Sequence, residues 1–111
     1  MEGSAQSFYI ALILYESHSD KLDYKPLYEE CFTLIKASSL KEAQEKTLVY
    51  AKKEESKSQN EYGETITWSL KQVVDVNPAL YDEFEDGTDL YARYFRNYEA
   101  YSSFEPLLSS D

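Results

Sequence analysis

Residues 7–15, which read SFYIALILY, form a nearly continuous apolar run. The run is too short for a helix of average length, and a strand with apolar side chains at consecutive positions is buried on both of its faces. Such a strand belongs in the middle of a sheet. We therefore predict a central strand here, and the rest of the chain must supply its neighbours and cover its two faces.

Two later segments have the pattern of flanking strands. Residues 27–36 (LYEECFTLIK) resume strand character after the polar stretch 18–26, which closes with a proline, so we predict an antiparallel hairpin with a long loop. Residues 64–76 first alternate apolar and polar side chains and then slip at 72–74, which indicates a β-bulge or a bend. Pro78 then ends this strand, because proline cannot donate to the ladder.

A last strand is predicted behind an acidic turn. Asp86-Gly87 is a turn signal, and residues 88–95 (TDLYARYF) follow it with a strand-like composition. The tail, residues 97–111, has an ambiguous pattern. A short helix anchored by aromatic side chains is one structure that it allows, with Tyr98, Tyr101 and Phe104 as the anchors.

A capping box predicts where the main helix begins. Ser39 can accept the backbone N–H of Glu42, and the glutamate carboxylate can reach back. Behind this box, one side of a helical wheel gathers Leu40, Ala43, Thr47, Leu48, Tyr50 and Ala51. The helix is therefore amphipathic and should pack this side on the sheet, and residues 55–60 are predicted to be a solvated linker.

These elements predict an α+β fold in a single domain, residues 1–111, with a flexible N-terminus at 1–6. The order is ββαββ: a four-stranded, mainly antiparallel sheet with one amphipathic helix packed on one face. The central first strand favours the strand order 2-1-3-4. Because one helix cannot cover both faces, the second face must be polar, covered by the tail or shared with another molecule. We expect that face to be rich in tyrosine and to take part in contacts.

Charge and composition limit the possible partners. The chain carries 21 Asp and Glu against 11 Lys and Arg, a net charge of −10, together with eleven tyrosines. This balance disfavours binding to nucleic acid or to anionic lipid and favours a basic protein partner. No stretch is long and apolar enough to span a bilayer, Met1–Ser4 lack the basic start of a signal peptide, and the lone Cys31 cannot form an internal disulfide. We expect a cytoplasmic protein.

The groups that most often carry out catalysis are scarce. The single histidine, His18, lies in a predicted polar loop, and the three glycines form no phosphate-binding loop. The acidic stretch from Asp82 lacks the ligands of an EF-hand, since Phe84 and Arg93 stand where oxygen ligands are needed. We predict no enzyme, no metal site and no cofactor.

Four segments together resemble a known bacterial family. They are Tyr28-Glu29-Glu30, residues 37–43 (ASSLKEA), residues 63–68 (GETITW) and residues 86–93 (DGTDLYAR). In order and spacing they resemble the family called domain of unknown function 4288, over roughly residues 8–101. The resemblance implies a small α+β fold and a bacterial source, and it carries no activity. Small acidic bacterial proteins of this kind also resemble immunity proteins, which neutralise a cognate toxin.

The leading hypothesis is a non-enzymatic interaction module, in one form an acidic immunity protein that masks a basic toxin. Its predicted contact residues are five carboxylates and two aromatic anchors: Asp82, Glu83, Glu85, Asp86, Asp89, Tyr91 and Tyr94. Two alternatives stay open. One is a homo-oligomeric structural domain that pairs its uncovered sheet face with a second copy. The other is a small-ligand-binding or enzymatic domain that uses Glu64, Trp68 and Arg93 near one end of the sheet.

Overall fold

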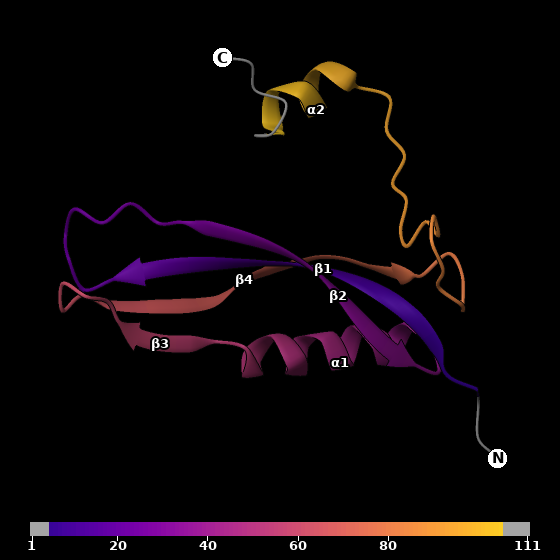
Figure 1. Ribbon diagram of the computed structural model, residues 1–111, viewed down its shortest axis with the longest axis horizontal. Helices are drawn as coiled ribbons and strands as arrows, with labels where there is room; N and C mark the ends of the chain where they lie inside the picture. Colours follow the sequence, from indigo (N-terminus) through magenta and orange to yellow (C-terminus); the bar gives the residue numbers. More distant parts are fainter. Residues whose placement is uncertain (1–4, 106–111) are drawn as a thin grey trace.

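A computed structural model describes residues 5–105, and its chain follows the predicted ββαββ order with an additional short helix at the end (Figure 1). The predicted flexible N-terminus lies outside the described residues at positions 1–4, and so does the end of the tail at 106–111. The strands and helices are β1 (Ser7–Ser19), β2 (Tyr28–Ala37), α1 (Leu40–Lys53), β3 (Ser56–Gln59), β4 (Thr65–Pro78) and α2 (Tyr98–Phe104).

The sheet has the order β2-β1-β4-β3, and every neighbouring pair is antiparallel. β1 is central, as its apolar run predicts, and it extends beyond that run to Ser19. At its far end the buried Ser17 hydroxyl contacts Tyr24 Oη at 2.6 Å and accepts the Leu27 backbone N–H at 2.8 Å. These bonds satisfy a buried polar group and hold the predicted long loop against the sheet.

β4 is irregular where it pairs with β1. The register shifts twice, so that Val74 and Lys71 have no partner on β1. The first of these bulges confirms the slip that the sequence shows at 72–74, and the second was not predicted. Because each bulge bends its strand and increases the local twist, the sheet curls along its length (Figure 1). The strand ends at Pro78, as predicted.

The N-terminus of α1 is capped largely as predicted. Ser39 Oγ accepts the Glu42 backbone N–H at 3.1 Å. The Glu42 carboxylate reaches back one residue farther than a standard capping box requires, and accepts the backbone N–H of Ser38 at 2.6 Å and its hydroxyl at 3.0 Å. These hydrogen bonds hold the pKa of Glu42 below its usual value.

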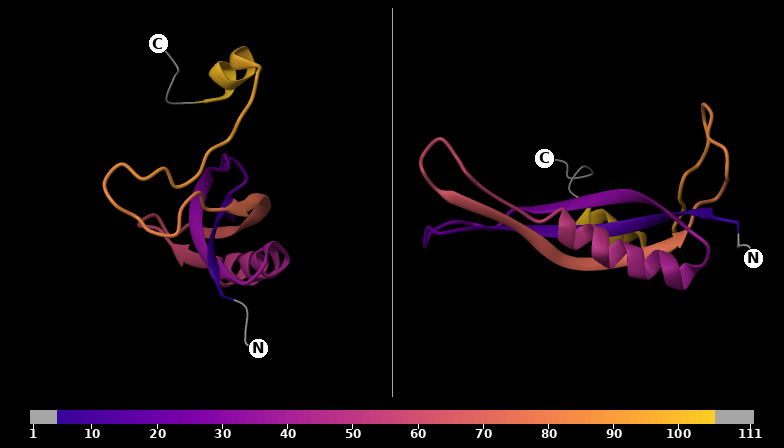
Figure 2. Two further views of the ribbon diagram at one scale, coloured as in Figure 1. Left: turned by 90° about the vertical axis from the view of Figure 1, so that its right-hand side faces the viewer. Right: turned by 90° about the horizontal axis from the view of Figure 1, so that it is seen from below.

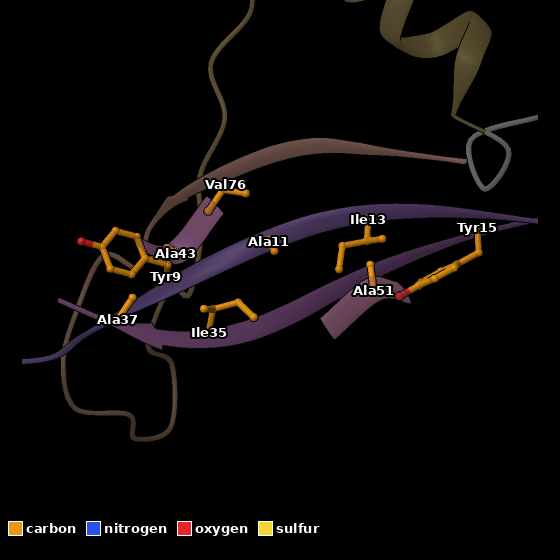
Figure 3. Packing of buried hydrophobic residues seen from close by; sticks show 9 residues of the cluster. All are labelled: Tyr9, Ala11, Ile13, Tyr15, Ile35, Ala37, Ala43, Ala51 and Val76. Carbon is orange, nitrogen blue, oxygen red and sulfur yellow. The ribbon is translucent and has the colours of Figure 1, made fainter. Parts of the chain in front are cut away.

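The side of α1 that packs on the sheet is narrower than predicted. Ala43, Thr47 and Ala51 are buried, whereas Leu40 and Leu48 are exposed. Small side chains at intervals of four residues let the helix approach the sheet closely, so the larger ones remain on its flanks. The buried Thr47 hydroxyl is satisfied because it donates a hydrogen bond to the Ala43 carbonyl at 2.7 Å. Figure 3 shows the resulting core, formed by Tyr9, Ala11, Ile13, Tyr15, Ile35, Ala37, Ala43, Ala51 and Val76.

The outermost strand next to β4 is not the predicted one. Residues 88–95 form no strand, and residues 56–59, predicted as linker, form β3. The prediction missed β3 because its side chains are polar and exposed, so it has no apolar pattern. A tight turn forms the hairpin instead: Asn60 N–H donates to the Glu64 carbonyl at 2.9 Å, and Gly63 takes a φ of 80°, which glycine tolerates best.

Candidate functional site

The two faces of the sheet are contacted by different parts of the chain. We call the side under α1 the helix face and the opposite side the second face. Figure 1 shows α1 on one side of the sheet and residues 80–104 on the other. The candidate site lies on the second face, which this irregular segment contacts near one end of the sheet before it leads away to α2.

Aromatic rings fasten the segment to the sheet. Directly after β4, Ala79 N–H donates to the Phe8 carbonyl at 2.9 Å. The Phe84 ring then packs against the Phe8 ring with centroids 5.2 Å apart, and Tyr91 meets Phe32 edge-on at 6.2 Å. Of the three alternatives for the second face, a cover from within the chain applies here, but it comes from residues 79–91 and not from the predicted tail.

Tyr91 also makes the main polar attachment. Its hydroxyl donates to the Asp75 carboxylate on β4, which accepts a second hydrogen bond from Asn77 Nδ2 at 2.8 Å. Burial and the Asp75 hydrogen bond raise the pKa of Tyr91 above its usual value. Because both its ring and its hydroxyl are engaged within the protein, Tyr91 holds the segment in place.

The five predicted contact carboxylates lie on an exposed loop. Asp82, Glu83, Glu85, Asp86 and Asp89 line one open cavity of about 580 Å³, together with Tyr81, Gly87 and Thr88. The loop is shaped by Thr88 Oγ1, which accepts the Glu85 N–H at 2.9 Å, and by Gly87, whose φ is 89°. Within residues 5–105 no Lys or Arg pairs with these five carboxylates, so their charge faces solvent.

Exposed aromatic residues follow the acidic loop. Tyr94 is 93% exposed, and Phe95, Tyr98 and Phe104 are also exposed. Within the tail, whose pattern was ambiguous, α2 forms a short helix, and Asn97 Oδ1 caps it by accepting the Ala100 N–H at 3.0 Å. Its aromatic residues do not anchor it to the sheet, because its only ring contact among the described residues is with the preceding stretch: Phe95 stacks on Tyr101 at 4.9 Å. Figure 2 shows α2 standing away from the sheet.

A cavity of about 610 Å³ separates α2 from β2. Its wall includes Phe32 and Glu30 from β2, Arg93 from the connecting stretch and Tyr101 from α2. The Cα radius of gyration, 17.5 Å, is larger than the roughly 13 Å of a compact domain of this length, which is consistent with an outlying tail.

Residues 8–92 match the family described as domain of unknown function DUF4288. The chain belongs to this family. No match was found among curated proteins or among solved structures.

The DUF4288 match covers the sheet, α1 and the acidic loop, and it ends directly after Tyr91. The exposed aromatic stretch from Tyr94 and the whole of α2 therefore lie outside the matched residues. The family supplies no activity, so the roles of its residues must be argued from this structure.

The structure separates the three residues of the predicted ligand or enzyme site. Trp68 lines a cavity on the helix face, and Arg93 lines the cavity beside α2 on the second face. Glu64 lies in the β3–β4 turn, where its carboxylate accepts Asn60 Nδ2 at 2.7 Å. These residues do not share a cavity, so that form of the hypothesis has no geometric support.

Other chemical groups are similarly dispersed. His18 belongs to β1, and not to a loop as predicted, because the strand runs to Ser19. Its Nε2 lies 3.5 Å from Glu16, which also pairs with Lys71 at 3.4 Å. In the described part of the chain no group of three or more His, Cys, Asp or Glu side chains could hold a metal ion, and no helix there could cross a membrane.

A further concave region, which was not predicted from the sequence, lies at the end of α1. We call it the α1-end cleft and define it by Tyr15, Glu29, Cys31, Tyr50, Glu54 and Trp68. Its residues come from β1, β2, α1 and β4. Consecutive residues of a strand point to opposite faces of a sheet. Glu29 accordingly lines this cleft, whereas Glu30 lines the cavity on the second face.

Proposed function

We propose that this DUF4288 protein is a non-enzymatic interaction module that binds a basic protein through its second face. The observation that carries the proposal is the continuity of two surfaces. An exposed loop with five unpaired carboxylates, residues 82–89, leads through Tyr91 into the exposed aromatic stretch 94–104.

The two surfaces would contribute differently to binding. Exposed aromatic rings such as Tyr94 and Phe95 supply stiff contact area of the kind that dominates interface energetics. The acidic loop adds to the field of a chain with a net charge of −10. Such a field steers a basic partner toward association rates of about 10⁸ M⁻¹s⁻¹ at low salt.

In its more specific form, the proposal makes the partner a basic toxin domain that this protein neutralises. The test is co-expression with the product of the neighbouring gene, followed by pull-down and stopped-flow binding at several salt concentrations. Binding that slows steeply with added salt supports the proposal. A basic neighbouring product that fails to bind would overturn the toxin form.

Matched charge variants locate the contact. Asp82→Asn, Glu83→Gln and Asp86→Asn together remove three negative charges from the acidic loop. Asp23→Asn, Glu45→Gln and Glu61→Gln remove the same charge from exposed positions elsewhere. The first triple variant should lower the association rate and its salt dependence more than the second. Equal effects would show that only net charge matters and that the loop is not the contact.

A second candidate function, a homo-oligomeric structural domain, is favoured by the edge strand β2. In the order β2-β1-β4-β3, one edge of this 10-residue strand has no neighbouring strand among residues 5–105. Such an edge can pair with a second copy of the chain. Light scattering decides the matter, since a monomer at tens of micromolar would remove this candidate.

A further inference from the structure

The α1-end cleft exists because α1 is shorter than the sheet beneath it. The 14 residues of α1 span about 21 Å, whereas the 14 residues of β4 extend about 46 Å. The helix ends at Lys53 with Glu54 as its C-cap. Beyond that point part of the helix face is uncovered, and a cavity of about 590 Å³ opens there.

One buried polar group in this cavity has no protein partner. Tyr15 is only 6% exposed, it lines the cavity, and within residues 5–105 its hydroxyl makes no hydrogen bond. Figure 3 shows the hydroxyl directed toward the stretch of α1 that carries Ala51. Buried hydroxyls are nearly always hydrogen-bonded, so an unsatisfied one beside a cavity indicates a place for a polar ligand.

The charges around the cavity indicate the sign of that ligand. Glu29 and Glu54 line it, no Lys or Arg does, and within the described residues neither carboxylate has an ion-pair partner. The negative end of the α1 dipole lies at Glu54 as well. Burial and then Glu29 raise the pKa of the Cys31 thiol, and burial followed by Cys31 and Glu54 raises that of Tyr15. The site therefore favours a cation.

The rings lining the cavity indicate what kind of cation. Trp68, Tyr50 and Tyr15 surround it with aromatic surface, which attracts organic cations through the negative ring faces. A metal ion would need a cluster of ligating side chains, and the described residues offer none. Alkylammonium and guanidinium groups combine positive charge, N–H donors and an apolar stem, and match all of these features.

We propose that the α1-end cleft binds an organic cation, an alkylammonium or guanidinium group, between the carboxylates of Glu29 and Glu54 and the ring of Trp68. The Tyr15 hydroxyl oxygen accepts a hydrogen bond from one of the cation's N–H groups. The cation can be a free amine or guanidine, or the side chain of a Lys or Arg on another protein. This site is on the helix face, so it does not depend on binding at the second face.

The test uses the only tryptophan of the chain, Trp68, as its own reporter. Butylammonium and butylguanidinium chloride are titrated while Trp68 fluorescence and backbone amide NMR shifts are recorded, with sodium chloride and valeramide as charge and shape controls. We expect butylammonium and butylguanidinium to give saturable changes with a millimolar or tighter dissociation constant. Valeramide and sodium chloride should give no such changes. Equal responses to all of these compounds, or no saturable response, would overturn the proposal.

Variants separate the cleft from general charge effects. Glu54→Gln should weaken butylguanidinium binding by at least about tenfold, because a charge-assisted hydrogen bond is lost. Glu30→Gln is the matched control, because it removes the same charge from a residue of β2 that faces away from the cleft. This variant should bind butylguanidinium with unchanged affinity. Equal loss in both variants would contradict the assignment.

A further arm identifies the source of the cation. A capped tripeptide, acetyl-Ala-Arg-Ala-amide, is titrated in the same way. If it binds as well as butylguanidinium, the cleft accepts a protein side chain. If only the free probes bind, the ligand is a small molecule. The triple variant of Asp82, Glu83 and Asp86 should bind all probes normally, so failure at the second face and failure at the cleft are distinguishable.

Discussion

The two faces of the sheet share one central strand and yet are closed to different degrees. Along β1 both sets of alternating side chains are buried, for example Ile13 on the helix face and Leu12 on the second face. On the neighbouring β2 the faces diverge: Ile35, on the helix face, is 6% exposed, and Leu34, on the second face, is 50% exposed. A regular helix with small contact residues closes the helix face along the helix's own length. On the second face, an irregular segment held by a few rings leaves apolar surface open.

This difference separates stability from contact. The helix face packs most of the buried side chains into one core. The second face keeps exposed rings that add little to folding and are free to meet a partner. We therefore expect substitutions on the two faces to have very different costs, and the following predictions run from the largest expected effect to the smallest.

Truncating one side chain on each face should give the largest contrast. Ile13→Ala removes fully buried atoms and should lower the free energy of unfolding by about 2–5 kcal/mol. Leu34→Ala, at a half-exposed position, should cost less than about 1 kcal/mol. Urea unfolding followed by circular dichroism measures both. A cost for Leu34→Ala as large as that for Ile13→Ala would show that the second face is equally sealed.

The attachment of the irregular segment depends on one hydroxyl. Tyr91→Phe removes the donor to Asp75 and should lower the free energy of unfolding by about 1–2 kcal/mol, because a hydrogen bond to a charged group is lost while Asn77 still donates. Amide exchange near Leu80 should accelerate as well. The control is Tyr94→Phe, where the ring is exposed and no change is expected.

The Tyr91 hydroxyl should also make the stability of the protein depend on pH in the alkaline range. The pKa of Tyr91 is raised in the folded protein, so its stabilising contribution is complete below pH 10.0, the usual value, and is lost as pH rises from there through the folded pKa. Wild type should therefore lose stability above pH 10.0 more steeply than Tyr91→Phe. Identical alkaline slopes would mean that the Tyr91–Asp75 bond contributes nothing.

The two helices should respond differently to loss of their caps. Ser39→Ala removes the cap of α1 and should cost about 1 kcal/mol in global unfolding free energy. Asn97→Ala removes the equivalent cap of α2, which buries no residue, and should leave global unfolding unchanged. Urea titrations of both variants check this. A global cost for Asn97→Ala would show that α2 is part of the folded core.

The smallest effect is expected at Glu16, on the second face. Partial burial raises its pKa, but the Tyr28 hydroxyl at 3.0 Å and the Lys71 charge outweigh this, so the pKa lies below 4.5. A depressed pKa contributes stability above the unfolded value, and this contribution is lost as pH falls through the folded pKa. Stability should therefore fall more steeply below pH 4.5 in wild type than in Glu16→Gln, as urea midpoints at several pH values would show.

The fold could be predicted from the sequence wherever the pattern of apolar side chains matches their burial in the structure. The apolar run of β1 placed it in the centre, the slip at 72–74 marked a bulge, and the Ser39 cap marked the start of α1. The outer strand could not be found in this way. β3 is joined to β4 by backbone pairing, whereas the more strand-like residues 88–95 contact the second face through Tyr91 and do not join the ladder.

The sites were less predictable, because a sequence pattern reveals only residues that lie close together along the chain. The acidic loop could be identified because its residues are consecutive. The α1-end cleft could not, because Tyr15, Glu29, Glu54 and Trp68 are brought together only when the helix proves shorter than the strands beneath it. Likewise, the sequence could not show that α2 stands away from the sheet, since its aromatic residues equally suit burial.

The tyrosines provide the most direct test of the difference between the faces. Photo-CIDNP NMR enhances only those tyrosine rings that a flavin dye in solution can touch. Tyr94 and Tyr98, which are 93% and 65% exposed, should give strong enhancements, and the core residues Tyr9 and Tyr15 should give none. Silence at Tyr94 and Tyr98 would mean that the aromatic surface is covered in solution, and would contradict an open second face.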